Sequence, residues 1–159
     1  MLPLHPQLIN KKMTTTLEKI KRYCAYQERC IQEVRGKLKE WKVEEEKIQK
    51  IVNELLKEEY INEERFAKTF VRGKFSIKSW GKQKIIAELK RRNINDFCIK
   101  EAIKEIDTTF YQEKLTKLAQ KWLNEHKQHT EQEEKQKLFR FLFSKGYEQE
   151  DILNFINKK

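Results

Sequence analysis

The chain has 159 residues, of which 38% are hydrophobic and 38% charged, and its net charge at pH 7 is +10. This composition supplies enough apolar side chains for a folded core and makes nearly every exposed position ionic. No apolar run approaches the roughly 18 residues of a membrane span, and the first sixteen residues lack the features of a secretory signal. Three cysteines without a Cys-x-x-Cys pair argue against a disulfide framework. We therefore expect a soluble, cytoplasmic protein without a membrane partner.

The same ladder of apolar residues occurs three times along the chain. Counted from Leu38, Leu89 and Leu142, its members lie at −4, 0, +5, +10, +13 and +14, and the copies are offset by 51 and 53 residues. The three copies are Val34, Leu38, Val43, Ile48, Ile51 and Val52; Ile85, Leu89, Ile94, Ile99, Ala102 and Ile103; and Leu138, Leu142, Tyr147, Ile152, Phe155 and Ile156. A fixed period of this length is typical of repeat proteins, whose units bury their apolar faces by stacking on one another.

Every predicted element is helical. Prolines occur only within the first six residues, there are four glycines, and apolar residues recur at i, i+3, i+4 and i+7. In chain order, this periodicity predicts helices around residues 17–24, 34–38, 48–52, 66–71, 85–89, 99–103, 115–122, 138–142 and 152–156. Turns are expected at 41–43, 92–94 and 145–147, where Gly146 suits a left-handed conformation. Three residues suit the start of the helix after each turn: Glu44, Asn95 and Glu148.

These elements predict an all-α fold, an elongated tandem array of three three-helix repeats. We place a flexible N-terminal tail at 1–14 and the repeats at 15–58, 59–107 and 108–159. A module of this size cannot bury a dependable core alone, so stacking must supply much of the stability.

Positive charge is concentrated in the middle repeat. Residues 65–92 contain ten basic residues and the single acid Glu88, whereas the rest of the chain nearly balances. The basic residues are Arg65, Lys68, Arg72, Lys74, Lys78, Lys82, Lys84, Lys90, Arg91 and Arg92. A charge run on a helix is most often only a solvated face, but this imbalance favours a surface that binds a polyanion.

The periodicity places these cations on two outward helix faces. The first face holds Arg65, Lys68 and Arg72, and the second, on the following helix, holds Lys84 and Arg91. Lysine and arginine side chains held on rigid helices match a phosphate backbone or an acidic protein groove.

Other motifs carry less chemistry. Trp80 is open to two interpretations, a stacking residue or a core anchor. At least one member of the triplet Phe139, Phe141 and Phe143 must point away from the core. No third ligand completes a metal site with His126 and His129, and no P-loop, Gly-x-Ser-x-Gly or nucleophile–base pair occurs. We therefore predict no catalytic residues, no metal, no cofactor and no enzymatic activity.

The segment from residue 60 to 94 resembles the bacterial RecX family, regulators of the RecA recombinase. The resemblance is carried by Tyr60, Ile61, Glu64, Arg65, Phe66, Ala67, Phe70, Val71 and Arg72, and then by Gly81, Lys84, Ile85, Glu88, Leu89 and Ile94. As a pattern it covers residues 17–157, whereas the motif itself covers only the middle repeat. One departure is Lys82, where many members have a proline after the glycine, and it bears on the start of the following helix.

The resemblance implies a regulator without catalysis that lodges in the groove of the RecA–DNA filament. Such a protein would inhibit the recombinase, ATPase and coprotease activities of RecA, and thereby restrain recombination and the SOS response. Its partners would be the RecA filament and single- or double-stranded DNA, bound weakly on its own, and it would be a monomer. The positions carried over as filament-facing are Arg65, Arg72, Lys84 and Arg91. Together with the charge pattern, they give the predicted RecA- and DNA-binding set: Arg65, Lys68, Arg72, Lys74, Lys78, Lys84, Arg91 and Arg92.

Two other functions remain open from the residues alone. The first is a stand-alone helical nucleic-acid-binding protein with a helix-turn-helix in the middle repeat, although readout of sequence normally needs a single recognition helix. The second is a helical-repeat adaptor for acidic proteins.

Overall fold

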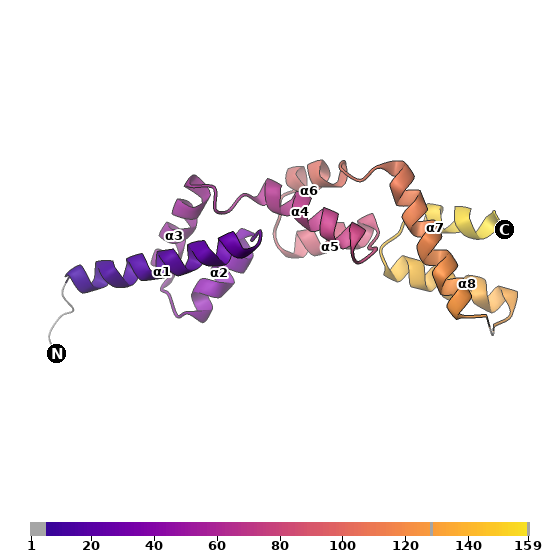
Figure 1. Ribbon diagram of the computed structural model, residues 1–159, viewed down its shortest axis with the longest axis horizontal. Helices are drawn as coiled ribbons and strands as arrows, with labels where there is room; N and C mark the ends of the chain where they lie inside the picture. The colour runs from indigo at the N-terminus through magenta and orange to yellow at the C-terminus, as the bar shows by residue number, and fades with distance from the viewer. Residues whose placement is uncertain (1–5, 128, 159) are drawn as a thin grey trace. The chain divides into compact units, whose positions relative to one another are not determined.

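The computed structural model describes residues 6–127 and 129–158, with only the backbone described from 6 to 14. In these ranges the chain is helical and contains no strand, which confirms the all-α prediction (Figure 1). The helices are α1 (Pro6–Tyr26), α2 (Ile31–Glu40), α3 (Glu45–Lys57), α4 (Glu63–Ser76), α5 (Lys82–Arg91), α6 (Asp96–Ile103), α7 (Thr108–Glu125), α8 (Glu131–Ser144) and α9 (Gln149–Asn157). They follow one another as three three-helix repeats, α1–α3, α4–α6 and α7–α9.

Helix α1 begins within the segment that the sequence analysis assigned to a flexible tail. Its first residue is Pro6, and no glycine or further proline interrupts the chain before Tyr26. Proline suits the first helical position because its missing N–H would have no partner there. Residues 1–5 of the expected tail lie outside the described residues. The predicted repeat boundaries remain predictions.

The same turn ends the second helix of every repeat. A residue with positive φ follows the helix in each case: Lys42 (59°), Asn93 (58°) and Gly146 (99°). The amide of the next residue donates to the carbonyl of the ladder leucine: Val43 to Leu38 at 3.0 Å, Ile94 to Leu89 at 3.1 Å and Tyr147 to Leu142 at 3.2 Å. This is the Schellman arrangement, which satisfies carbonyl groups at a helix end. The predicted turns and the threefold repeat are therefore confirmed, and the equivalent hydrogen bond occurs in all three repeats.

The third helix of every repeat begins at the residue type expected there. The residues before α3, α6 and α9 are Glu44, Asn95 and Glu148, as predicted. The Asn95 side chain accepts a hydrogen bond from the Cys98 amide at 2.8 Å, which satisfies one of the free donors of the first turn.

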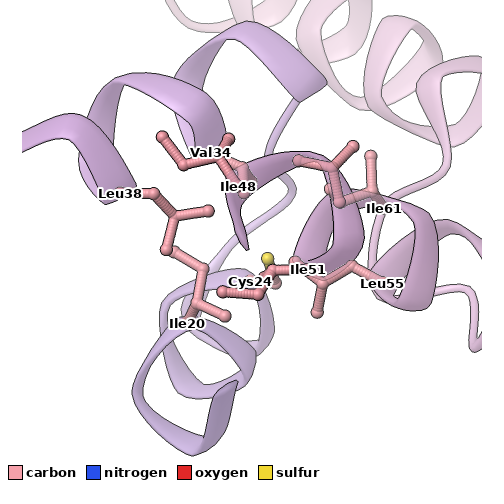
Figure 2. Close-up of a cluster of buried hydrophobic side chains, with 9 residues drawn as sticks. Ile20, Cys24, Val34, Leu38, Ile48, Ile51, Leu55 and Ile61 are labelled. Carbon is pink, nitrogen blue, oxygen red and sulfur yellow. The ribbon is translucent and has the colours of Figure 1, made fainter. Parts of the chain in front are cut away.

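By its contacts the chain divides into two compact units, of which the first ends at Phe66 and the second begins at Ala67. The first unit has one apolar core built from α1, α2 and α3 (Figure 2). Its members are Ile20, Cys24, Val34, Leu38, Ile48, Ile51, Val52, Leu55 and Ile61. Burial raises the pKa of the Cys24 thiol to about 11, so this cysteine stays protonated and acts as a small apolar side chain. All three cysteines of the chain are free and buried.

In the second unit, two glycines bring the start of α5 against the α8–α9 turn. The Gly81 amide donates to the Lys145 carbonyl at 2.7 Å, and the Gln83 amide donates to the Gly146 carbonyl at 2.9 Å. A methyl group on Gly81 would overlap the backbone of Gly146, and one on Gly146 would overlap Lys84. We call this contact the glycine junction.

Two buried tyrosines extend the glycine junction. The Tyr147 hydroxyl donates to the Ser79 carbonyl at 2.9 Å. The Tyr111 hydroxyl accepts from the Lys82 amide at 3.0 Å and donates to the Glu148 carboxylate at 2.7 Å. Lys82, where the sequence departs from the proline of many similar proteins, starts α5. Its backbone N–H makes the bond to Tyr111, which a proline could not make because it has no N–H. Burial raises the pKa values of Tyr111 and Glu148, which is consistent with their enclosed hydrogen bonds.

Each ladder leucine should contribute substantially to the stability of its own unit. Leu38, Leu89 and Leu142 are each 0% exposed. Replacing any of them with alanine should lower the free energy of unfolding by about 2–5 kcal/mol, because buried methyl groups are lost and a cavity remains. Urea unfolding gives the size of the effect, and segment-resolved hydrogen exchange gives its location. Leu142→Ala should reduce protection in α5 as well as α8, whereas a loss that includes α1–α3 would contradict the division into two units.

The glycine junction predicts opposite effects of alanine at different glycines. Gly146→Ala should lower the free energy of unfolding by at least about 2 kcal/mol, because the positive φ disfavours a Cβ and the new methyl meets Lys84. Gly36→Ala is the matched control in α2, where nothing lies within 4 Å of the added methyl. It should raise stability by about 0.5–1 kcal/mol through helix propensity. Equal effects of the two substitutions would show that the junction is not tightly packed.

Candidate functional site

Three of the predicted binding residues gather around a pair of aromatic rings in the second unit. Phe70 of α4 and Trp80, in the α4–α5 connection, meet at 67° with 6.4 Å between ring centroids. The Lys74 and Lys84 ammonium groups lie 4.8 and 4.4 Å from the Trp80 ring centroid. The Arg92 guanidinium lies 4.9 Å from the Phe70 centroid. These distances are within the range of cation–π attraction. We call these five residues the Trp80 cluster.

Hydrogen bonds hold the backbone at Ser79 and at Trp80. Ser79 adopts a positive φ of 58°, and its carbonyl accepts the hydrogen bond from the Tyr147 hydroxyl. The Trp80 amide donates to the Lys74 carbonyl at 3.1 Å. Just before these residues, Ile77 is 79% exposed and Lys78 is also exposed. The connection therefore presents a cation and an apolar side chain next to a half-buried tryptophan.

Glu88 is the acid closest in sequence to this surface, and two arginines hold it. Its carboxylate lies 3.1 Å from Arg91 and 3.0 Å from Arg92. The hydrogen bond from Arg92, followed by the charge of Arg91, holds the pKa of Glu88 below its usual value. Glu88 therefore neutralises part of the charge of the two arginines, and the charge of Lys84, one turn earlier on α5, also acts on it.

Two of the predicted residues on α4, Arg72 and Arg65, have acidic partners that the sequence did not reveal. Arg72 donates to both carboxylate oxygens of Glu105, at 3.0 and 3.3 Å. In the first unit, Arg65 donates to Glu28 at 2.5 Å and to the Glu59 carbonyl at 2.9 Å. These arginines are partly exposed but are held in place, so they contribute to the fold as well as to the surface charge.

A groove of about 460 Å³ lies beside Arg72 in the second unit. It is lined by Val71, Arg72, Phe75, Ser76, Glu105, Ile106, Asp107, Phe110, Glu113, Lys114 and Lys117. Its charged residues are equally divided between cations and acids. The Lys114 ammonium donates to the Ser76 carbonyl at 2.9 Å. The groove was not predicted, because its walls come from segments far apart in the sequence.

The aromatic residues of the third repeat divide between core and surface as expected. Phe143 is 58% exposed and stacks on Phe139, with 5.8 Å between ring centroids. Phe141 packs against Trp122. His126 also stacks on Trp122, at 4.2 Å between ring centroids. In the part of the chain that the structure describes, no group of His, Cys, Asp and Glu side chains could hold a metal ion, and no helix there is long and apolar enough to cross a membrane.

These features define an all-helical repeat protein whose most distinctive surface is cationic and aromatic. Family models for the first, second and third three-helix domains of RecX match residues 17–55, 62–103 and 110–156. The chain belongs to the RecX family.

The similarity extends to curated relatives and to solved structures. The regulatory protein RecX of Clostridium perfringens (strain 13 / Type A) is 32% identical over 118 residues, which are 73% of this chain and 55% of that protein. That of Clostridium beijerinckii is 34% identical over 128 residues, which are 79% of this chain and 59% of that protein. The chain spans about half the length of the curated relatives that it matches.

Two crystal structures show the same fold. The RecX from Lactobacillus salivarius has a TM-score of 0.81 at 24% identity, covering 94% of this chain and 97% of that one. A second regulatory protein RecX has a TM-score of 0.86 at 22% identity, covering 96% of this chain and 76% of that one.

The low pKa of Glu88 predicts a pH-dependent contribution to stability. The folded-state pKa lies below the unfolded value of about 4.3, so the contribution is present above that value and is lost as the pH falls through the folded pKa. Glu88→Gln should therefore lower the melting temperature at pH 7, and the difference from the wild type should shrink toward pH 3. Glu113→Gln, at an exposed position inside α7, is the control and should show little change at either pH. A difference for Glu88→Gln that persists at low pH would assign the effect to packing instead.

Proposed function

We propose that this protein binds the RecA–DNA filament in its groove and inhibits the recombinase, ATPase and coprotease activities of RecA. It thereby restrains recombination and the SOS response. It acts as a monomer in the cytoplasm and performs no catalysis of its own. The observation that carries the proposal is the match of all three repeats to the domains of RecX, a family whose curated relatives are named regulatory proteins.

The surface chemistry supports a filament as the partner. A RecA–DNA filament offers phosphates and a protein groove together, and the second repeat offers both cations and exposed apolar side chains. Lys78 and Lys84 are suited to phosphate contact, because Lys78 is exposed and the Lys84 ammonium lies over the Trp80 ring. Arg72 and Arg65 are already bound to acids, so a filament would have to compete for them.

The proposal is tested by RecA-catalysed ATP hydrolysis on single-stranded DNA with this protein added below the RecA concentration. The wild type should reduce hydrolysis, and Lys78→Glu combined with Lys84→Glu should weaken inhibition by at least about tenfold, since two phosphate contacts become repulsive. The dependence of inhibition on salt should also become shallower in this variant. Lys84 is half-buried beside Gly146 and Trp80, so this variant should melt at a modestly lower temperature, and thermal unfolding checks that it is still folded at the assay temperature.

Lys50→Glu combined with Lys121→Glu is the matched control, with the same change in net charge at exposed positions of α3 and α7. This control should inhibit RecA as well as the wild type does. Unchanged RecA ATPase and strand exchange at equimolar wild-type protein would falsify the proposal, and so would ATP hydrolysis by this protein alone.

A further inference from the structure

Trp80 has the surroundings of a stacking platform, although one edge of its ring packs against Phe70. Its side chain is half-buried, and its ring meets Phe70 at 67°, so the two rings are not stacked on each other. Its closest charged neighbours are the ammonium groups of Lys74 and Lys84. Ammonium groups are mobile ends of flexible side chains, and they can leave the ring when a better partner arrives.

A nucleobase is such a partner for the Trp80 ring. Base stacking on an aromatic side chain is stronger than the attraction of a partly hydrated ammonium, and every base has a face that can stack. The displaced Lys74 or Lys84 ammonium remains within reach of the same segment of ligand, where the phosphates that flank the base attract it. Binding thus replaces one contact, between the ring and an ammonium group, with two contacts to the same ligand: the base stacks on the ring and the ammonium binds a phosphate.

The charge around the cluster favours a polyanion, unlike the charge around the groove. Lys74 and Lys84 lie over the Trp80 ring, Lys78 is exposed two residues before Trp80, and the nearby Glu88 is bound to Arg91 and Arg92. The groove beside Arg72 contains acids and cations in equal number, so a phosphate chain would meet repulsion there.

The third repeat holds the Trp80 platform in place before any ligand binds. The Tyr147 hydroxyl bonds to the carbonyl of Ser79, and the Lys145 carbonyl accepts from the amide of Gly81. Trp80 therefore lies between two residues that are fixed by the α8–α9 turn. A connection that is already ordered loses less conformational entropy on binding.

We infer that the Trp80 cluster is a binding site for single-stranded nucleic acid, in which a base stacks on Trp80 while Lys74 and Lys84 bind the flanking phosphates. Tyr147 is a positioning residue for this site. Duplex DNA binds less well, because its bases are stacked on one another and would have to be extruded at a cost. The inference deepens the proposed function, since it names the part of a RecA–DNA filament that this surface contacts.

The test uses the whole 159-residue chain and a fluorescein-labelled oligo-dT strand, with affinity followed by fluorescence anisotropy. Trp80→Leu should weaken binding by roughly 5- to 150-fold, the factor that corresponds to the loss of one stacked base. Trp80→Phe keeps a ring and should retain most of the affinity. Neither substitution should alter the salt slope, whereas Lys84→Gln should reduce it by about 0.7, the value of one phosphate contact on a single strand.

A spectroscopic readout separates stacking from a structural role of Trp80. Oligo-dT should quench part of the tryptophan fluorescence of the wild type. That quenching should be lost in Trp80→Phe although this variant still binds, because the other tryptophans, Trp41 and Trp122, lie outside the cluster. Trp41→Leu is the matched control in the first unit and should bind oligo-dT like the wild type. Quenching that persists in Trp80→Phe would overturn the inference even if Trp80→Leu were unstable.

The remaining outcomes distinguish this inference from the proposed function. Equal affinity for oligo-dT and for a duplex of the same length overturns the inference, as does wild-type affinity of Trp80→Leu for oligo-dT. If the wild type inhibits RecA but does not bind oligo-dT, the inference fails, the proposed function stands, and the cluster contacts an acidic protein surface instead. If the wild type binds oligo-dT through Trp80 but leaves RecA unaffected, the inference stands and the proposed function fails.

Discussion

The backbone of Gly81 lies against the backbone of Gly146, and the polar contacts between the start of α5 and the third repeat follow from this approach. Because neither residue has a Cβ, the start of α5 comes close enough to the α8–α9 turn for two backbone hydrogen bonds to form. These bonds place the hydroxyl of Tyr147 at Ser79 and leave the Lys82 amide for Tyr111. Apolar contacts alone are non-directional, whereas hydrogen bonds have a narrow range of distances and angles. The junction therefore fixes the register of two repeats that an apolar interface would leave free to slide.

The repeat architecture could be predicted because its determinants are local. The ladder leucines and the turns that follow them lie within a few residues of one another, so the periodicity alone locates both. The left-handed position of the turn is filled by Lys42, Asn93 and Gly146 in the three repeats. From the sequence, Gly146 indicates only the end of a helix. The second reason for a glycine here is the close approach of Lys84, which belongs to another repeat. No periodic pattern in the sequence connects Gly146 with Lys84.

The candidate binding surface could be predicted only in part, because some of its contacts also join distant parts of the sequence. Charge imbalance identified the cations, but the ion pairs of Arg72 with Glu105 and of Arg65 with Glu28 join segments that are distant in the sequence. The two sequence interpretations of Trp80 each describe part of what the structure shows. Its ring packs beside Phe70, as a core anchor would, and it also lies beside two ammonium groups, as a stacking residue would.

The conformation of the α4–α5 connection is not determined by its own residues. Serine has no preference for the left-handed region that Ser79 occupies, so neighbouring contacts must stabilise it. Those contacts come from the third repeat, through Tyr147 and Lys145. In a second repeat without its neighbour, these bonds would be absent, and the connection would sample other conformations. The third repeat therefore contributes to the surface around Trp80 through backbone geometry, and stacking of repeats shapes the proposed binding site as well as the core.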